Sequence, residues 1–433
     1  MMAVAAASAS GQIPTKHAPA EASSRSLDAV NLFLAAALSG FGPYVAVFLA
    51  GQNWPQQDIG FVLTAAGLAG LLSQPLGGEL LDVIRSKRIV VAIGAIMVAT
   101  SALILALWPS FPLVFAALIL QGMTGGFLGM AIAAISLGLV GHAALGERLG
   151  RNQRFASAGG VVAALLMGFI GDFLSYRGIF LTSAALVLPL LVALRGIQTS
   201  DIHYGSACGA PDHEGPRAPM RARRLTLWQN RSLLIFSGSV FLFQLANASM
   251  LPLVGEALAY GKQAYSTLTL SALIIVPQII VVLMAPWAGR SAKTWGRRPL
   301  LLIGFAALPL RALVFAATEN QGALIVAQLL DGISGTMLGV LTALTIADLT
   351  SGSGRFNLAQ GSVGMISGVG ASLSTTLFGL IAGNLGRAAG FLGIAAVGVI
   401  AVLLLWLFMP ETNPSSVSKN GWPNVPRPKA KRG

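Results

Sequence analysis

Two ionisable residues, Arg311 and Asp331, lie in stretches that are otherwise apolar. Charges inside a membrane are costly and usually mark an ion pathway or pair with each other. At 1.5 Å per residue, the two lie about 10 and about 15 Å from the same membrane surface, so the arginine can reach the acid. If they pair, Asp331 stays ionised and carries no proton. If Asp331 instead faces a cavity alone, burial favours its protonated form and makes it a candidate proton carrier.

Uncharged polar residues recur at helical spacing in the same and other apolar stretches. Asp331, Ser334, Thr342 and Thr345 fall at +3, +11 and +14, on one helix face. Polar residues of this kind could line a substrate cavity between the helices. The candidates are Asn31, Gln121, Thr124, Gln244, Asn247 and Ser334. The alternative to a substrate-binding role is that these buried amides only form hydrogen bonds between helices, each of which stabilises the helix pair by about 0.6 kcal/mol.

A cavity with these residues has few charges and mostly apolar walls. Such walls suit an amphipathic or weakly cationic small molecule. A sugar phosphate or di-acid would need several fixed Arg or Lys side chains. Arg311 alone could hold a monocarboxylate, so uptake of a narrow substrate of that kind stays an alternative.

The composition places these residues in a membrane protein. The chain has 433 residues, of which 55% are hydrophobic and 10% charged, with a mean hydropathy of +0.75. Soluble proteins carry about 25% charged residues. Several apolar stretches reach the roughly 20 residues that cross a bilayer as a helix, and they do not alternate as the strands of a β-barrel would. We expect an all-α polytopic membrane protein.

Twelve transmembrane helices are predicted, in two sets of six separated by a polar segment. The expected spans are 28–50, 58–78, 89–107, 111–140, 155–173, 178–195, 232–255, 266–288, 299–318, 321–347, 358–382 and 388–409. The expected organisation is a disordered cytoplasmic tail (1–25), a six-helix bundle (26–195), a cytoplasmic connector (196–231), a second bundle (232–409) and a disordered basic tail (410–433).

The basic residues predict the orientation. With both termini in the cytoplasm, 24 of the 28 Lys and Arg lie inside, whereas only Arg177, Lys262 and Arg387 lie in outer loops. Cytoplasmic loops carry an excess of Lys and Arg. We therefore expect a multi-pass protein of the cell (inner or plasma) membrane with cytoplasmic termini, in which Arg148, Arg151 and Arg154 anchor a cytoplasmic loop.

The two halves contain a parallel repeat. The segments 120–129 and 330–339 share five of ten residues at an offset of 210. The loops after the second and eighth helices match at an offset of 211, where Gly78 and Asp82 correspond to Gly289 and Lys293. Parallel repeats of this kind place a substrate site at the midplane between two moving bundles.

These loops resemble the signature Gly-x-x-x-Asp-Arg/Lys-x-Gly-Arg-Arg of the major facilitator superfamily, and the resemblance covers about 26–409. The chain is most similar to the twelve-span drug–proton antiporter group. It lacks two of that group's features: Leu118 replaces an arginine of helix 4, and helix 5 has no Gly-Pro between Gly159 and Gly171. The resemblance implies a cavity lined by helices 1, 4, 7 and 10.

The resemblance also implies a cytoplasmic gate, in which Asp82 meets the start of helix 11. The free N–H groups and positive end of that helix, near Arg355, would attract the acid; the alternative for Asp82 is a plain helix cap. In the other half Lys293 stands where an acid is expected, and Glu147 is its candidate partner. The candidate gate residues are Gly78, Asp82, Lys87, Arg88, Gly289, Lys293, Gly296, Arg297, Arg298 and Arg355.

Other function classes lack support in the sequence. There is no phosphate-binding Gly-x-x-x-x-Gly-Lys-Ser/Thr motif, no convergent catalytic set, and one cysteine, which excludes an internal disulfide. The connector residues His203, Cys208, Asp212 and His213 have no regular spacing and are interpreted as a solvated loop rather than a metal site.

We therefore predict a secondary active transporter of a small amphipathic molecule, and no enzyme. Alternating access driven by protons, with efflux as the direction, is the favoured mechanism. A proton-coupled uptake permease is the alternative, and a receptor or channel is a third. No cofactor, metal or nucleic acid is expected, and a monomer within the lipid bilayer is expected to suffice.

Overall fold

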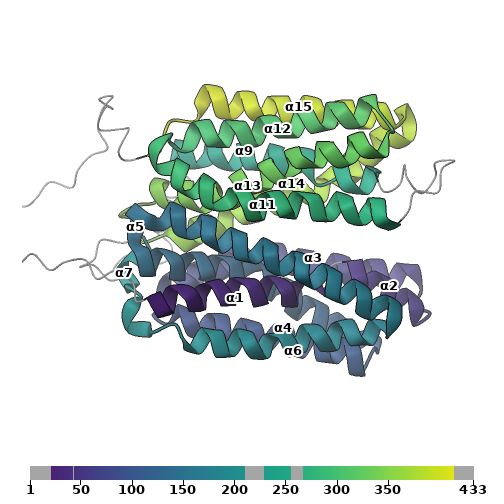
Figure 1. Ribbon diagram of the computed structural model, residues 1–433, viewed down its shortest axis with the longest axis horizontal. Coiled ribbons are helices and arrows are strands. Elements are labelled where there is room, and N and C mark those ends of the chain that lie inside the picture. Colours follow the sequence, from purple (N-terminus) through teal and green to yellow (C-terminus); the bar gives the residue numbers. More distant parts are fainter. Residues whose placement is uncertain (1–20, 42, 210–228, 255–266, 414–433) are drawn as a thin grey trace, which may run out of the picture.

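The computed structural model describes residues 21–41, 43–209, 229–254 and 267–413. All its regular elements are helices, and they form two bundles that lie side by side (Figure 1). The first bundle contains α1 (Glu21–Ser39), α2 (Pro43–Gly51), α3 (Gln56–Val83), α4 (Lys87–Leu107), α5 (Phe111–Phe173) and α6 (Tyr176–Arg195). The second contains α9 (Arg231–Asn247), α11 (Thr267–Thr294), α12 (Arg297–Ala317), α13 (Gln321–Leu349), α14 (Phe356–Leu385) and α15 (Arg387–Phe408).

The twelve predicted transmembrane helices are confirmed. Within the described residues eleven helices are long and apolar enough to cross a membrane. The longest, α5, holds two spans, because Gly141 has a φ of 65° and interrupts the helix. Helices α1 and α2 together form the first span.

Each bundle has its own apolar core. Phe180 and Leu27 lie in the core of the first bundle, and Phe236, Phe305 and Phe391 in that of the second. The outer surface carries many exposed large apolar side chains, as a lipid-facing surface requires.

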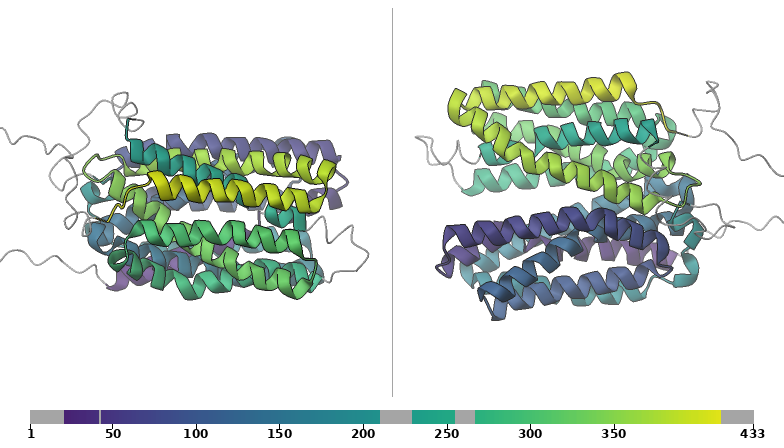
Figure 2. Two further views of the ribbon diagram at one scale, coloured as in Figure 1. Left: turned by 90° about the horizontal axis from the view of Figure 1, so that it is seen from above. Right: turned by 180° about the vertical axis from the view of Figure 1, so that it is seen from behind.

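The start of α1 and the end of α15 lie on one face of the molecule, called the terminal face below (left in Figure 1). The inter-helix turns at 84–86 and 295–296 lie on the same face, as does the start of the connector. The left-hand view of Figure 2 shows the same arrangement from above.

Several predicted boundaries are wrong at this face. Helix α1 starts at Glu21, inside the expected tail 1–25. The fifth span follows Gly141 directly rather than starting at 155, because a glycine with positive φ turns the chain without a loop. Arg148, Arg151 and Arg154 are therefore helical residues and not loop residues.

The expected connector and C-terminal tail are also partly folded. The connector forms η1 (Thr199–Asp201) and α7 (Tyr204–Ala207), and Cys208 is buried instead of solvated. Asp212 and His213 lie outside the described residues. Glu411, in the expected tail 410–433, accepts hydrogen bonds from the backbone N–H groups of Arg297 and Arg298 at the start of α12, with N···O distances of 2.8 and 3.0 Å.

Candidate functional site

The two bundles meet through glycines near the terminal face. A Cβ added at Gly78 of α3 would collide with the carbonyl oxygen of Asn357 in α14. The contact between α5 and α11 has the same form, because a Cβ at Gly289 would collide with the carbonyl oxygen of Gly146. Gly289 lies 211 residues after Gly78, and Asn357 lies 211 residues after Gly146. The repeat seen in the sequence is therefore a pseudo-twofold relation between two inter-bundle contacts.

A second pair of contacts lies one helical turn deeper. A Cβ at Gly361 would collide with the carbonyl oxygen of Gln74, and a Cβ at Gly150 with that of Ala285. These four positions leave room for no side chain, so the backbones of the two bundles touch here. The terminal face is closed in this structure.

Asp82 joins the bundles at the end of α3. Its carboxylate accepts hydrogen bonds from the backbone N–H groups of Asn357 (3.2 Å) and Leu358 (3.0 Å) and from the side-chain amide of Asn357 (2.9 Å). The two N–H groups belong to the first turn of α14, where no intrahelical acceptor exists. The predicted contact between Asp82 and the start of helix 11 is thus formed, although Asn357 and Leu358, rather than Arg355, supply the hydrogen bonds to Asp82.

The neighbouring basic residues hold the first bundle together. Lys87 is buried, and its ammonium donates to the backbone carbonyls of Leu81 and of Ile84, the latter at 2.6 Å. Arg88 donates to the carbonyl of Ile197 at 2.7 Å. Both residues fix the turn after α3 rather than reaching the other bundle.

Among the described residues, the second repeat forms no equivalent of the Asp82 contact. Lys293 and Glu147 line a cavity of about 380 Å³ on the terminal face. The expected pairing of Glu147 with Lys293 is not among the ion pairs between described residues. Instead, Arg297 pairs with Asp348 of its own bundle at 2.9 Å, while Gly296 has a φ of 95° and precedes α12.

A central cavity of about 360 Å³ lies between the bundles, deeper than these contacts. Its polar lining residues are Asn31, Asn152, Gln153 and Gln360, and none of the described residues that line it is charged. Apolar and glycine positions of both bundles make up the rest, including Gly125 and Gly339 of the two repeated segments. The cavity can therefore hydrogen-bond a ligand without offering it a counter-ion.

Arg311 and Asp331 form an ion pair in the second bundle, which is one of the two arrangements that the sequence allowed. Arg311 is 4% exposed and pairs with Asp331, whose side chain is 30% exposed. The guanidinium also donates to the amide oxygens of Asn247 (2.6 Å) and Gln328 (3.2 Å) and contacts the sulfur of Met250 (3.0 Å). Arg311 thus links α9, α12 and α13.

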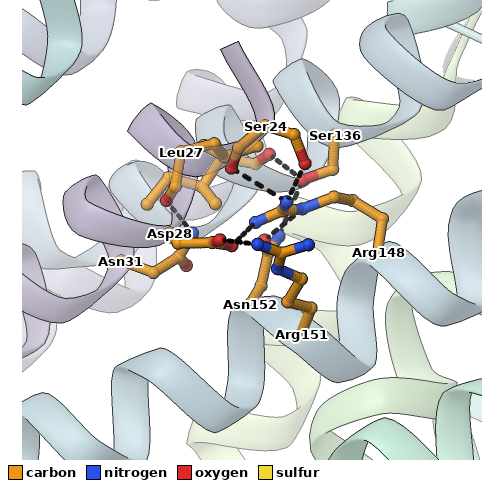
Figure 3. A network of polar contacts seen from close by, with 9 residues as sticks. Ser24, Leu27, Asp28, Asn31, Ser136, Arg148, Arg151 and Asn152 are labelled. Carbon is orange, nitrogen blue, oxygen red and sulfur yellow. Dashed lines mark hydrogen bonds and ion pairs between the residues drawn. The ribbon is translucent and has the colours of Figure 1, made fainter. Parts of the chain in front are cut away.

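The first bundle contains a second buried charge network, which sequence reasoning missed (Figure 3). Asp28 of α1 pairs with Arg148 and, at 2.5 Å, with Arg151, both on α5. Arg148 also donates to Asn152 at 2.8 Å, and Asn152 donates to the Ser136 hydroxyl at 2.7 Å. Asp28 lies at the boundary of the predicted first span and the two arginines lie in a predicted loop; an acid within an otherwise apolar first span is the signal in the sequence that points to this network.

The predicted cavity residues separate into four groups. Asn31 lines the central cavity. Asn247 lies in the Arg311 network, and the hydroxyls of Thr124 and Ser334 donate to the backbone carbonyls of Leu120 and Gly304. Gln121 and Gln244 are half-buried and are not among the residues lining this cavity.

Comparison with known proteins agrees with this architecture. The family model for the Major Facilitator Superfamily matches residues 27–308 and 233–432. An uncharacterized MFS-type transporter of Mycobacterium tuberculosis is 35% identical over 405 residues, which is 93% of this chain and 96% of that protein. The class B tetracycline resistance protein of Escherichia coli is 30% identical over 140 residues, 32% of this chain and 34% of its own.

Solved structures show the same fold. The E. coli fucose:proton symporter superposes with a TM-score of 0.70 at 16% identity, over 90% of this chain and 98% of that one. The human organic anion transporter MFSD10 superposes with a TM-score of 0.66 at 15% identity, over 89% and 99% of the two chains. The two six-helix halves, their glycine-packed interface and the family match together show that the chain belongs to the major facilitator superfamily of membrane transporters and is not an enzyme.

Proposed function

We propose that the protein exports small amphipathic organic molecules in exchange for protons. The observation that carries this proposal is the central cavity between the two halves. Its four amides and apolar walls suit a molecule that has hydrogen-bonding groups and a hydrophobic body. A small, strongly hydrated ion would lose its hydration there without gaining a charged partner, whereas a lipophilic cation, whose charge is spread over an apolar body, has little hydration to lose.

The direction and coupling rest on two supports. Tetracycline resistance proteins are among the sequence relatives, which favours export. Asp331 is the more accessible member of the buried pair with Arg311. When Asp331 takes up a proton, Arg311 remains held by Asn247 and Gln328, so the pair can open without leaving an unpartnered guanidinium.

The membrane orientation is part of the proposal. The terminal face carries the turns rich in Lys and Arg and is taken as cytoplasmic, in the cell membrane. The closed contacts at Gly78 and Gly289 then make this state closed toward the cytoplasm. Asp82, Lys87, Arg88 and the basic residues of the matching loop act as the cytoplasmic gate and its supports.

Inverted membrane vesicles with an imposed proton gradient test this function. The substrates are tetracycline and a lipophilic cationic dye, and the variants are wild type, Asp331→Asn and the control Asp58→Asn in α3. Proton-driven accumulation by wild type and Asp58→Asn, with a loss of at least tenfold in Asp331→Asn, supports the proposal. Accumulation that persists without a gradient, or that Asp331→Asn leaves unchanged, contradicts proton coupling through Asp331.

Uptake of a monocarboxylate receives less support from the geometry. Arg311 is the one cation proposed to bind such a substrate, and its guanidinium already contacts Asp331, Asn247, Gln328 and Met250. In the same vesicles, a short-chain monocarboxylate that moves with protons while tetracycline and dye do not would favour the uptake alternative.

A further inference from the structure

The first residues of the connector fold against the place where the two bundles meet. This segment, residues 199–209, contains η1 and α7 and follows α6. Its Ala207 and Cys208 are buried, and Cys208 is the only cysteine of the chain. A segment interpreted from its composition as a solvated linker is thus packed at the gate.

The connector segment contacts the first bundle around the turn after α3. The Tyr204 hydroxyl lies 2.9 Å from the carbonyl oxygens of both Asp82 and Val83. The Cys208 thiol donates to the Asp82 carbonyl at 3.3 Å and accepts from the Lys87 ammonium at 3.5 Å. Lys87 also lies 4.9 Å above the Tyr204 ring, a favourable cation–π distance.

The same segment contacts the second bundle at the start of α14. The backbone N–H of Phe356 donates to the Cys208 carbonyl at 3.2 Å, and the Asn357 side-chain amide donates to the Ala207 carbonyl at 3.2 Å. That amide also donates to the Asp82 carboxylate. One side chain of the second bundle therefore binds both the gate acid and the connector.

We propose that residues 199–209 are a clasp that holds the terminal face closed and detaches from α14 when that face opens. The proposal rests on the alternating access proposed above. The clasp stays with the first bundle, because Tyr204, Lys87 and the bond from the His203 N–H to the Gly138 carbonyl (3.0 Å) attach it there. Separation of α3 from α14 breaks the bonds to Phe356 and Asn357 and exposes Cys208.

At the pseudo-symmetric position between α5 and α11, Glu147, Lys293 and Asn413 line a cavity. The described residues after α15 bind the second bundle there, since Glu411 accepts hydrogen bonds from the N–H groups of Arg297 and Arg298, and the Asn413 amide donates to the Lys293 carbonyl at 3.0 Å. The clasp contacts with α14 therefore belong to the α3–α14 side of the gate.

The first experiment measures whether weakening the clasp makes a buried site at the terminal face more accessible to a thiol reagent. Ala285, at the α5–α11 contact and fully buried, becomes a thiol reporter as Ala285→Cys in a Cys208→Ser background. Maleimide labelling of the full-length protein in membranes is compared with and without Tyr204→Phe, which removes only the hydroxyl. We expect labelling to be at least threefold faster with Tyr204→Phe and unchanged with the control Tyr176→Phe. An unchanged rate in Tyr204→Phe would overturn the proposal.

The second experiment uses native Cys208 to detect detachment. Gly150→Ala places a methyl group against the Ala285 carbonyl, far along the chain from the clasp, whereas a Cβ at the control position Gly160 meets no atom within 4 Å. We expect Cys208 to label at least fivefold faster in Gly150→Ala and at the wild-type rate in Gly160→Ala. A slow rate in both would show that the segment does not detach. These rates do not depend on a substrate, so failure of the export assay leaves the clasp result distinguishable.

Discussion

The Asp82 contact gives a quantitative prediction for the closed state. Asp82→Asn keeps the size of the side chain but leaves one acceptor oxygen where the carboxylate accepts three hydrogen bonds. If the amide oxygen faces Asn357, the amide NH2 group faces the Leu358 N–H, and two donors oppose each other. Hydrogen bonds to a charged group contribute about 1.5–3 kcal/mol. Since about 1.4 kcal/mol is a factor of ten, the ratio of closed to open molecules should fall about 10- to 150-fold.

Distances between spin labels across the terminal face measure this ratio. The labels are attached at Ala143→Cys and Ser351→Cys in a Cys208→Ser background, at exposed positions on the two bundles. Asp82→Asn should transfer population from the short to the long distance, whereas the control Asp58→Asn at the other end of α3 should not. An unchanged distance distribution in Asp82→Asn would refute the reasoning and leave Asp82 as a plain helix cap.

Four further perturbations have directions fixed by the contacts and by burial. Asp28→Asn leaves the buried Arg148 without its anion and should lower the unfolding free energy by about 3–5 kcal/mol in detergent. Arg311→Met removes the cation beside Asp331, whose side chain is 30% exposed, so we expect a smaller loss of about 1–3 kcal/mol; equal stability to wild type in denaturant titrations would contradict both. Gly361→Ala overpacks a backbone contact and should weaken closure by about 1–3 kcal/mol, seen as a longer spin-label distance, whereas Gly51→Ala, with no neighbour within 4 Å, should have no effect. Burial raises the pKa of the Cys208 thiol, so less thiolate is present at neutral pH, and its maleimide labelling should keep rising above pH 9, where an ordinary thiol levels off.

The sequence by itself determined the fold class, the twelve spans and the division into two halves. Continuous apolar runs can be satisfied in a bilayer only by helices, because no water is available to the backbone. The offset of 211 also predicted that Gly78 and Gly289 occupy equivalent places. The signature loop, through its resemblance, placed Asp82 at the start of helix 11. These properties depend on local or periodic features of the sequence, so they can be predicted without knowing the tertiary structure.

Only the tertiary structure decided which polar groups meet. The sequence allowed Arg311 and Asp331 to form an ion pair or Asp331 to face a cavity alone. Their pairing depends on the rotation of α12 and α13 about their axes, which hydropathy does not determine. The pairing of Asp28 with Arg148 could not be predicted while Arg148 was assigned to a loop, because a glycine with positive φ starts the helix more than ten residues earlier than expected. The packing of the connector could not be predicted from its sequence for a related reason. Its packing depends on hydrogen bonds to backbone groups of other segments, and these leave no pattern in its own composition.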